Sequence, residues 1–235
     1  MSPLPNSEGL LRRRFAHSAV ESRRRLGSSD PAPRHPAVVS SERTVAQVSL
    51  YPHVIRKAIP YPKPPLATER FLLRPFRVND FEIANEVGED PSTARWVNAL
   101  PSSDGAGVVR FNESKRRGGS MLDLVIADRI SDAYLGEILL FSREWQAGEL
   151  AYVVAPFARG RGIATDALKL LTRWAFDQLG LQRLQLKADP DNAASQRVAE
   201  KAGYQREGLL RSSFVVRGRR SDSVLYSRLL TDASP

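Results

Sequence analysis

Apolar and polar residues alternate in seven short segments between residues 67 and 231, a pattern typical of strands with one buried face. The first segment, TERFLLRPF, alternates around Phe71 and Leu73 and is closed by Pro75. The predicted strands are 68–76, 122–128, 134–141, 148–154, 181–188, 204–211 and 221–230. Most of this region is therefore expected to lie in a sheet.

Helical spacing interrupts the alternation in three places. Asp80 can cap a helix over about 81–88. A longer helix follows the turn GRG and ends at Gly180, where a C-terminal glycine belongs. Its apolar residues fall on one broad face, formed by Ala164, Ala167, Leu168, Leu171, Trp174 and Ala175. The segment PDNAASQRVAEKAG predicts a third, short helix that again ends at a glycine.

This order of elements predicts an α/β protein built on a mixed, mostly antiparallel sheet with helices on its faces. Strands 148–154 and 181–188 are expected to run parallel, joined by the long helix as a crossover. Residues 1–46 mix arginine triplets with Ser, Pro and Gly, so we expect a disordered basic tail. Residues 47–66 are predicted to be a proline-punctuated linker, and 67–231 the folded domain.

Charge is concentrated at the N-terminus. The chain has a formal net charge of +9 and a pI near 10.2. Residues 1–66 hold 11 basic and 4 acidic residues, which leaves only +2 for the remainder. A nearly balanced domain is not expected to bind nucleic acid itself, although the tail is a candidate for ribosome or RNA contact.

Cysteine is absent, which excludes disulfides, thiolate metal sites and cysteine nucleophiles. No apolar run reaches the roughly 18 residues that a membrane span needs, and the start lacks the apolar block of a secretory signal. We therefore expect a cytoplasmic protein without a membrane partner.

The turn between strand 148–154 and the long helix has the chemistry of an anion site. Helix N-termini expose unpaired N–H groups and a partial positive charge. Gly160 and Gly162 allow close approach and positive φ, Arg159 and Arg161 add charge, and Thr165 adds a hydroxyl group. No Walker run G-x-x-x-x-G-K-[ST] is present.

The residues Arg159-x-x-Gly162-x-Ala164 match the Q/R-x-x-G-x-G/A signature of the GCN5-related N-acetyltransferase (GNAT) superfamily. The segments ERFLLRPF, LGEILLF, GELAYVV and DPDNAASQRVAEKAGYQREG fall in the family's order and spacing. The chain resembles the branch that contains the ribosomal-protein alanine N-terminal acetyltransferases, over roughly 67–230.

The resemblance implies acetyl-CoA as cosubstrate. No metal is expected, because the carboxylates of the domain are scattered and it contains no histidine. Backbone N–H groups of 160–164, with Arg159 and Arg161, would bind its pyrophosphate. The parallel strands would splay apart around the pantetheine arm, the backbone near Val153 and Val154 would polarise the thioester carbonyl, and Asn192 would contact the arm. The implied cofactor-binding set is Val153, Val154, Arg159, Gly160, Arg161, Gly162, Ile163, Ala164, Thr165 and Asn192.

Proton transfer has few candidates, because His17, His35 and His53 all lie before the predicted domain, in residues 1–66. Many superfamily members place a tyrosine acid seven residues after the Asn, where this chain has Ala199. The resemblance offers Ser195, in NAAS, as the group that hydrogen-bonds the sulfur. For the base, Glu149, Glu137 and water stay open.

The acceptor predicted first is a protein N-terminal α-amine of the ribosomal-protein type. At pH 7 its deprotonation costs roughly 1 kcal/mol, against roughly 4.6 kcal/mol for lysine. The alternatives are a small amine (an antibiotic, a polyamine or an amino acid) and a non-catalytic CoA-binding module. The loop-like segment 101–121 is expected to form much of the acceptor wall, and the chain to be a monomer or homodimer.

Overall fold

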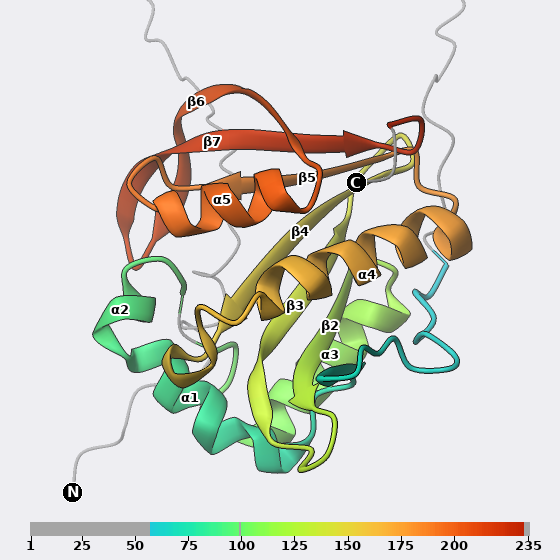
Figure 1. Cartoon of the computed structure of the whole chain (residues 1–235). Helices are drawn as coiled ribbons and strands as arrows, with labels where there is room; N and C mark the ends of the chain where they lie inside the picture. The colour runs from blue at the N-terminus through green and yellow to red at the C-terminus, as the bar shows by residue number, and fades with distance from the viewer. Residues whose placement is uncertain (1–56, 99, 233–235) are drawn as a thin grey trace, which may run out of the picture. The chain divides into compact units, whose positions relative to one another are not determined.

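The computed structural model describes residues 57–98 and 100–232. They form a seven-stranded sheet in the order β1-β2-β3-β4-β5-β7-β6, with helices on its faces (Figure 1). The strands are β1 (Phe71–Arg74), β2 (Met121–Asp128), β3 (Tyr134–Ser142), β4 (Ala147–Val154), β5 (Arg183–Ala188), β6 (Gln205–Val216) and β7 (Arg219–Leu229). The helices are α1 (Phe81–Glu89), α2 (Pro91–Ala94), α3 (Gly105–Arg117), α4 (Ile163–Leu179) and α5 (Ala193–Lys201). The predicted α/β class and mixed sheet are confirmed.

Strands β4 and β5 form the parallel pair of this sheet, and the pairs around them are antiparallel. Their pairing covers three positions and ends where Glu149 lies opposite Gln185. Strand β4 nevertheless continues to Val154, and β5 to Ala188. The two strands therefore separate beyond Glu149, and this end of the sheet is called the splayed end below (Figure 1).

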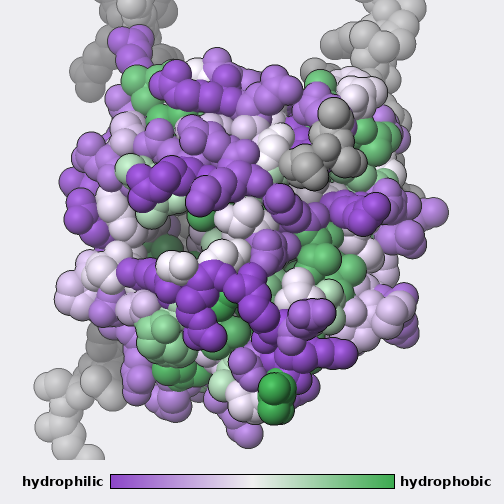
Figure 2. All heavy atoms as spheres, viewed as in Figure 1, coloured by the Kyte–Doolittle hydropathy of each residue, from purple (hydrophilic) through white to green (hydrophobic). Residues whose placement is uncertain are grey.

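Helices α4 and α5 cover one face of the sheet, and α3 lies behind it (Figure 1). The predicted face of α4 is confirmed, since all its members but half-buried Ala164 are buried. Side chains from the strand centres complete the core beneath it, among them Leu124, Ile126, Ile138, Leu140, Leu150 and Leu184. The outer surface over α4 and α5 is mostly hydrophilic (Figure 2).

The segment 101–121 is not the loop that its composition predicts. Residues Gly105–Arg117 form α3, which Asp104 caps by accepting a hydrogen bond from the Gly107 N–H. Few of its residues are buried, so its apolar face is too narrow to be read from the sequence. Because α3 packs against β2, two strands away from β4, it is not placed to form much of a wall at the splayed end.

Residues 57–66, the described part of the predicted linker, run beside α3. The Ile59 N–H donates to the Arg116 carbonyl at 3.0 Å, and the Arg116 guanidinium donates back to the Ile59 carbonyl at 2.7 Å. The same guanidinium lies over the Tyr61 ring, 4.5 Å from its centre. The predicted tail, 1–46, lies outside the described residues, and the linker and domain boundaries stay predictions.

Helices within the described ranges are all too short or too polar to cross a membrane.

Candidate active site

The turn that leads into α4 leaves the first N–H groups of this helix without a side-chain cap. A short 3-10 helix (Pro156–Ala158) follows β4, and Gly160 and Gly162 then adopt φ angles of +74° and +77°. The first backbone bond across the turn runs from the Asp166 N–H to the Gly162 carbonyl, at 3.0 Å. The N–H groups that precede Asp166 are the donors that a helix start presents to an anion.

Both glycines are needed for conformation rather than for lack of space. A Cβ on Gly160 would meet no atom within 4 Å, and one on Gly162 would lie 3.7 Å from Arg70 Nη2. Ile163 is buried and anchors the first turn of α4, while Ala164 and Thr165 are half-buried. The backbone of the turn is thus accessible on its outer side, with its inner side fixed to the core.

Arg159 is turned away from the helix start. Its Nε donates to the Val154 carbonyl at 3.0 Å, Nη1 donates to Ser92 Oγ at 2.7 Å, and Nη2 donates to Thr93 Oγ1. In this arrangement Arg159 connects the turn to the end of β4 and to α2. That it also binds pyrophosphate stays a prediction.

Arg161 is exposed, and its backbone carbonyl accepts a hydrogen bond from Arg70, which also pairs with Asp166. Nothing in the spacing around the turn points to Arg70, because it precedes β1, some 90 residues earlier. A hollow of about 210 Å³ opens beside these residues and is lined in part by Arg70, Arg161 and Ile163. Arg161 of the turn and Arg70 from the segment before β1 therefore both line this hollow.

The end of β4 presents the backbone of Val154, not that of Val153, to the splayed side. The Val153 carbonyl lies against Gly136 of β3, 2.2 Å from where a Cβ on that glycine would be. The Ala155 N–H also points to β3 and donates to the Leu135 carbonyl at 2.9 Å. Because backbone groups alternate sides along a strand, those of Val154 face away from β3.

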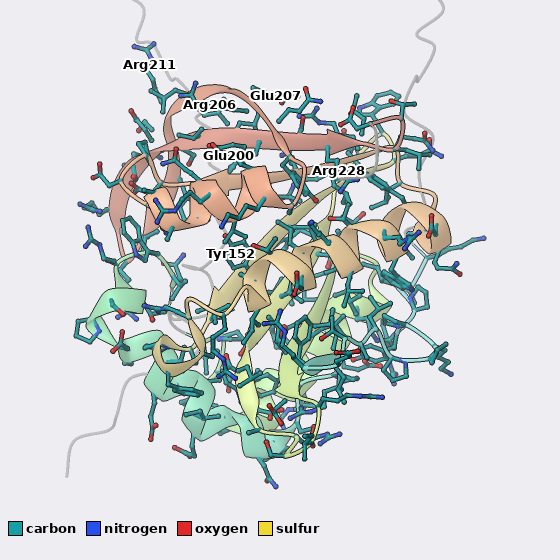
Figure 3. The ribbon with its side chains drawn as sticks, viewed as in Figure 1. Tyr152, Glu200, Arg206, Glu207, Arg211 and Arg228 are labelled. Atoms are coloured by element: carbon teal, nitrogen blue, oxygen red, sulfur yellow. The ribbon has the colours of Figure 1, made fainter. Side chains whose placement is uncertain are left out.

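The start of α5 brings Asn192 and Ser195 to the face of β4 that α4 and α5 cover. Asn192 caps the helix, its Oδ1 accepting from the Ser195 N–H at 3.0 Å. Ser195 Oγ lies 2.9 Å from the hydroxyl of Tyr152, a residue of β4 that lies between α4 and α5 (Figure 3). Burial raises the pKa of Tyr152 to about 12, although the Ser195 hydrogen bond lowers it, so the phenol keeps its proton at neutral pH.

Tyr152 is the residue that the sequence analysis missed. The alternation of β4 assigns it to the same face as Leu150, the face toward the core. A tyrosine at such a position reads as a core residue unless its hydroxyl partner is known. That partner, Ser195, is 43 positions away.

Glu149 lies on the opposite face of β4, where it is held by cations. Its Oε2 is 3.3 Å from Lys187 Nζ and 3.1 Å from Arg143 Nη2. The Gln185 Nε2 also donates to this oxygen, at 3.1 Å. Burial alone would raise its pKa, but Lys187 and Arg143 hold the pKa of this carboxyl below its ordinary value. Such a carboxylate is a weak base.

Glu137 shares this face but is buried in β3, where it accepts a hydrogen bond from the Tyr134 hydroxyl at 2.9 Å. Burial, and secondarily the charge of Glu137, raise the pKa of Asp123 on the neighbouring strand well above its ordinary value. Asn112 of α3 donates to one oxygen of Asp123, at 2.5 Å. These carboxyl groups form a buried cluster under α3, and Glu137 is less accessible than Glu149.

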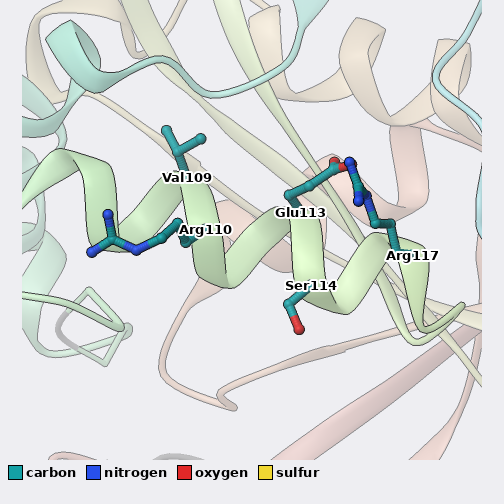
Figure 4. Close-up of a pocket in the computed structure, with 5 residues that line it drawn as sticks. All are labelled: Val109, Arg110, Glu113, Ser114 and Arg117. Carbon is teal, nitrogen blue, oxygen red and sulfur yellow. The ribbon is translucent and has the colours of Figure 1, made fainter.

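A larger hollow, of about 490 Å³, lies along the outer side of α3 (Figure 4). It is lined by Val109, Arg110, Glu113, Ser114 and Arg117. Its residues come from α3, which packs on β2, so it is separate from the turn and from the splayed end. The described residues also contain no group of three side chains that could hold a metal ion.

Comparison with known proteins identifies the family. Residues 70–205, more than half of the chain, match the model of the acetyltransferase (GNAT) domain. The chain therefore belongs to the GNAT acetyltransferases.

Individual relatives and structures agree with this assignment. The uncharacterised N-acetyltransferase p20 of Bacillus licheniformis is 25% identical over 169 residues, which covers 70% of this chain and 95% of the relative. The spermidine N(1)-acetyltransferase of Escherichia coli K12 is 23% identical over 152 residues, covering 65% of this chain and 82% of the relative. The crystal structure of the ribosomal-protein-S5-alanine acetyltransferase of Vibrio fischeri superposes with a TM-score of 0.63 at 19% identity, covering 73% of this chain and 99% of that structure.

These findings make the chain an N-acetyltransferase rather than a non-catalytic module, and the predicted resemblance is confirmed. The solved structure, at 19% identity, shows a shared fold. The site also fits acetyl-CoA on its own observations. It combines an uncapped helix start, two glycines with positive φ and a parallel pair that separates beyond Glu149.

Proposed function

We propose that this chain transfers an acetyl group from acetyl-CoA to the α-amine at a protein N-terminus. The observation that carries the choice of acceptor is the pairing of Glu149 with both Lys187 and Arg143. A polyamine carries several positive charges and needs surplus negative charge to bind. On this face the carboxylate of Glu149 is already neutralised by two cations, so a singly charged α-amine is the better match.

The turn would hold the nucleotide end of acetyl-CoA. The N–H groups of Gly160, Arg161, Gly162, Ile163 and Ala164 would bind its pyrophosphate, helped by the Arg161 side chain and the Thr165 hydroxyl. Arg159 would keep the turn attached to β4 and α2, the role that its present contacts support. The pantetheine arm would lie at the splayed end, beside the Val154 backbone and the Asn192 amide.

Acetyl-CoA supplies the acetyl group as a thioester. In the transfer, the amine nitrogen forms a bond to the acetyl carbon, the carbon–sulfur bond breaks, and the nitrogen loses a proton. The sulfur leaves as a thiolate and takes up a proton. Ser195, hydrogen-bonded to Tyr152, is the group proposed to donate toward this sulfur, and Tyr152 would return a proton to Ser195.

The amine proton has two proposed acceptors, Glu149 and water. Glu149 is one of the candidates from the sequence, but its lowered pKa makes it a weak base. An α-amine with a pKa near 7.7–8.0 is already partly neutral at pH 7, so water suffices as the proton acceptor. Glu149 would then orient the amine, and the substitution described in the Discussion separates the two roles.

A small-amine acceptor is the second candidate, because one relative is a spermidine acetyltransferase at 23% identity. Location in the cytoplasm, contact of the tail with ribosome or RNA, and a monomeric or homodimeric state stay predictions from the sequence.

The test measures CoA release by the full chain with peptides that begin with Ala, Ser or Met, with the same peptides blocked at the N-terminus, and with spermidine. We expect kcat/KM for an unblocked peptide to exceed that for spermidine at least about tenfold, a difference of about 1.4 kcal/mol. A higher kcat/KM for spermidine than for the peptides would support the second candidate, a small-amine acceptor. Absence of acetyl-CoA binding would refute the assignment of the turn.

A charge variant sharpens this test. Lys187→Met removes one of the two cations from Glu149, and we expect it to increase activity on spermidine relative to the peptide. Lys201→Met, at an exposed lysine of α5, is the matched control with the same change in net charge. If both variants behave alike, Glu149 and its partners do not select the acceptor.

A further inference from the structure

The turn between β6 and β7 has a conformation that its first residue disfavours. Arg217 and Gly218 connect the strands, and Val216 pairs with Arg219 across them. Both turn residues have positive φ, +47° for Arg217 and +82° for Gly218, as in a type I′ turn. Asn, Asp or Gly is preferred at the first position, because longer side chains are strained there. An arginine at this position therefore needs a compensating interaction.

The compensation comes from the chain around α2, residues 88–98, which we call the α2 segment. The Arg217 guanidinium pairs with both carboxylate oxygens of Glu89, at 2.9 and 3.1 Å. It also donates to the carbonyl oxygens of Gly88, at 2.9 Å, and Val97, at 3.3 Å. One side chain thus binds both ends of the α2 segment.

The backbone of the turn joins the same contact. The Arg217 N–H donates to Asn98 Oδ1 at 2.8 Å, and Asn98 Nδ2 donates to the Val215 carbonyl at 3.2 Å. Asn98 therefore pairs with the end of β6 through its side-chain amide, much as another strand would through its backbone. These bonds fix the α2 segment to the hairpin independently of the guanidinium.

The α2 segment is also held on its other side, by the turn that leads into α4. Arg159 reaches Ser92 and Thr93 while its Nε is bonded to Val154 at the end of β4. The hairpin and α2 consequently meet near the splayed end, and Figure 1 shows α2 below the curved start of β7. An acceptor that approaches the thioester from this end would have to pass the α2 segment.

We propose that Arg217 is a positioning residue for the acceptor: it fixes the α2 segment against the hairpin and thereby sets the affinity for the acceptor amine. The proposal rests on the proposed function, because it places the acceptor at the splayed end. The Arg217 and Glu89 side chains are 36% and 51% exposed, so their ion pair is screened by solvent. The expected effect on KM is therefore moderate, about three- to tenfold.

The test is steady-state kinetics of the full chain with Arg217→Asn. Asparagine suits the turn and keeps the backbone N–H to Asn98, but it removes the contacts to Glu89, Gly88 and Val97. We expect KM for the acceptor to rise about three- to tenfold, with KM for acetyl-CoA unchanged within about twofold. Arg219→Asn is the control, because it removes the same charge from an exposed residue of the same hairpin.

Two further variants separate positioning from general stability. Arg217→Lys should restore part of the acceptor affinity, and Glu89→Gln should raise KM in the same direction but less. Hydrogen–deuterium exchange of residues 88–98 should increase in Arg217→Asn and stay at the wild-type level in Arg219→Asn. A structural defect alone would lower thermal stability and kcat without this selective change in acceptor KM.

The outcomes are distinguishable from failure of the proposed function. If the wild type acetylates an amine but Arg217→Asn has an unchanged acceptor KM, the positioning role is refuted while the function stands. An equal rise in Arg219→Asn would refute it too, because the effect would then be one of net charge. A wild type with no turnover on any amine would refute the proposed function and this role with it.

Discussion

The two faces of β4 carry ionisable side chains whose pKa values are shifted in opposite directions. On the face covered by α4 and α5, the Tyr152 hydroxyl is buried beside Ser195 and its pKa is raised to about 12. On the other face, Glu149 is paired with Lys187 and Arg143 and its pKa is lowered. At neutral pH the first group carries a proton that it can donate, and the second carries none and accepts one poorly.

This difference divides the chemistry of acetyl transfer between the faces. In the proposed reaction, the leaving sulfur is protonated from Ser195 and Tyr152, on the side covered by α4 and α5. Deprotonation of the amine has no equally suited acceptor, which favours an amine that loses its proton readily. The proposed preference for an α-amine over a lysine thus rests on the electrostatics of one strand.

Removal of the Tyr152 hydroxyl should have the largest effect on kcat. Tyr152→Phe keeps the ring in its packing position but leaves Ser195 without its proton source. General acid catalysis typically contributes 10²–10⁴-fold, and Ser195 remains, so we expect kcat to fall about 10- to 100-fold. Initial rates with saturating acetyl-CoA and acceptor measure this loss.

Tyr204→Phe is the matched control for that variant. Tyr204 is also buried, with its hydroxyl 2.6 Å from Thr172 Oγ1, and burial raises its pKa as well. Its loss should lower the free energy of unfolding by about 1 kcal/mol and leave kcat unchanged. Equal kcat values in the two variants would show that Tyr152 serves packing rather than proton transfer.

Much of this comparison could be predicted from the sequence, because local patterns determine it. Alternation in GELAYVV places Glu149 and Tyr152 on opposite faces, and the glycines at 160 and 162 predict a turn with positive φ. The apolar face of α4 follows from helical spacing. Each of these features is determined by residues within a few positions of one another.

The remaining features depend on contacts between distant segments. The Tyr152–Ser195 hydrogen bond, the ion pairs of Glu149 and the contact of Arg159 with α2 appear only when the sheet is assembled. Helix α3 was missed for a different reason. It contains two glycines and a basic end, so its propensity is weak and packing on β2 has to stabilise it.

Asp123 of β2 is another carboxyl group on the same sheet face as Glu149, but its pKa is shifted in the opposite direction. Asp123 has no cation within ion-pair distance among the described residues, and its Oδ1 has no hydrogen-bond partner. Burial raises its pKa well above the ordinary value of 3.8, so the folded protein holds a proton that the unfolded chain releases. Stability from this group is complete below about pH 4 and declines as pH rises toward the raised pKa.

Asp123→Asn should remove this pH dependence. Asparagine resembles the protonated acid and can still pair with Asn112 after an amide flip. Within the window, the stability of the wild type should fall relative to that of the variant by about 1.4 kcal/mol per pH unit. Urea denaturation of both proteins at pH 5, 7 and 9 measures the difference. A constant difference across this range would mean that Asp123 is ionised in the folded state.

The smallest effect is expected for Glu149→Gln, which tests the other face directly. Glutamine keeps the size of the side chain and a contact with Gln185 but has no charge for Lys187 and Arg143. If Glu149 only orients the amine, kcat/KM should fall less than about tenfold, and the rise of activity with pH should still follow the amine, near 7.7–8.0. Profiles of kcat/KM against pH for both proteins decide this. A loss above about 100-fold, with the acidic limb of the pH profile abolished, would make Glu149 the base among the three candidates from the sequence, and β4 would then supply proton donor and acceptor from its two faces.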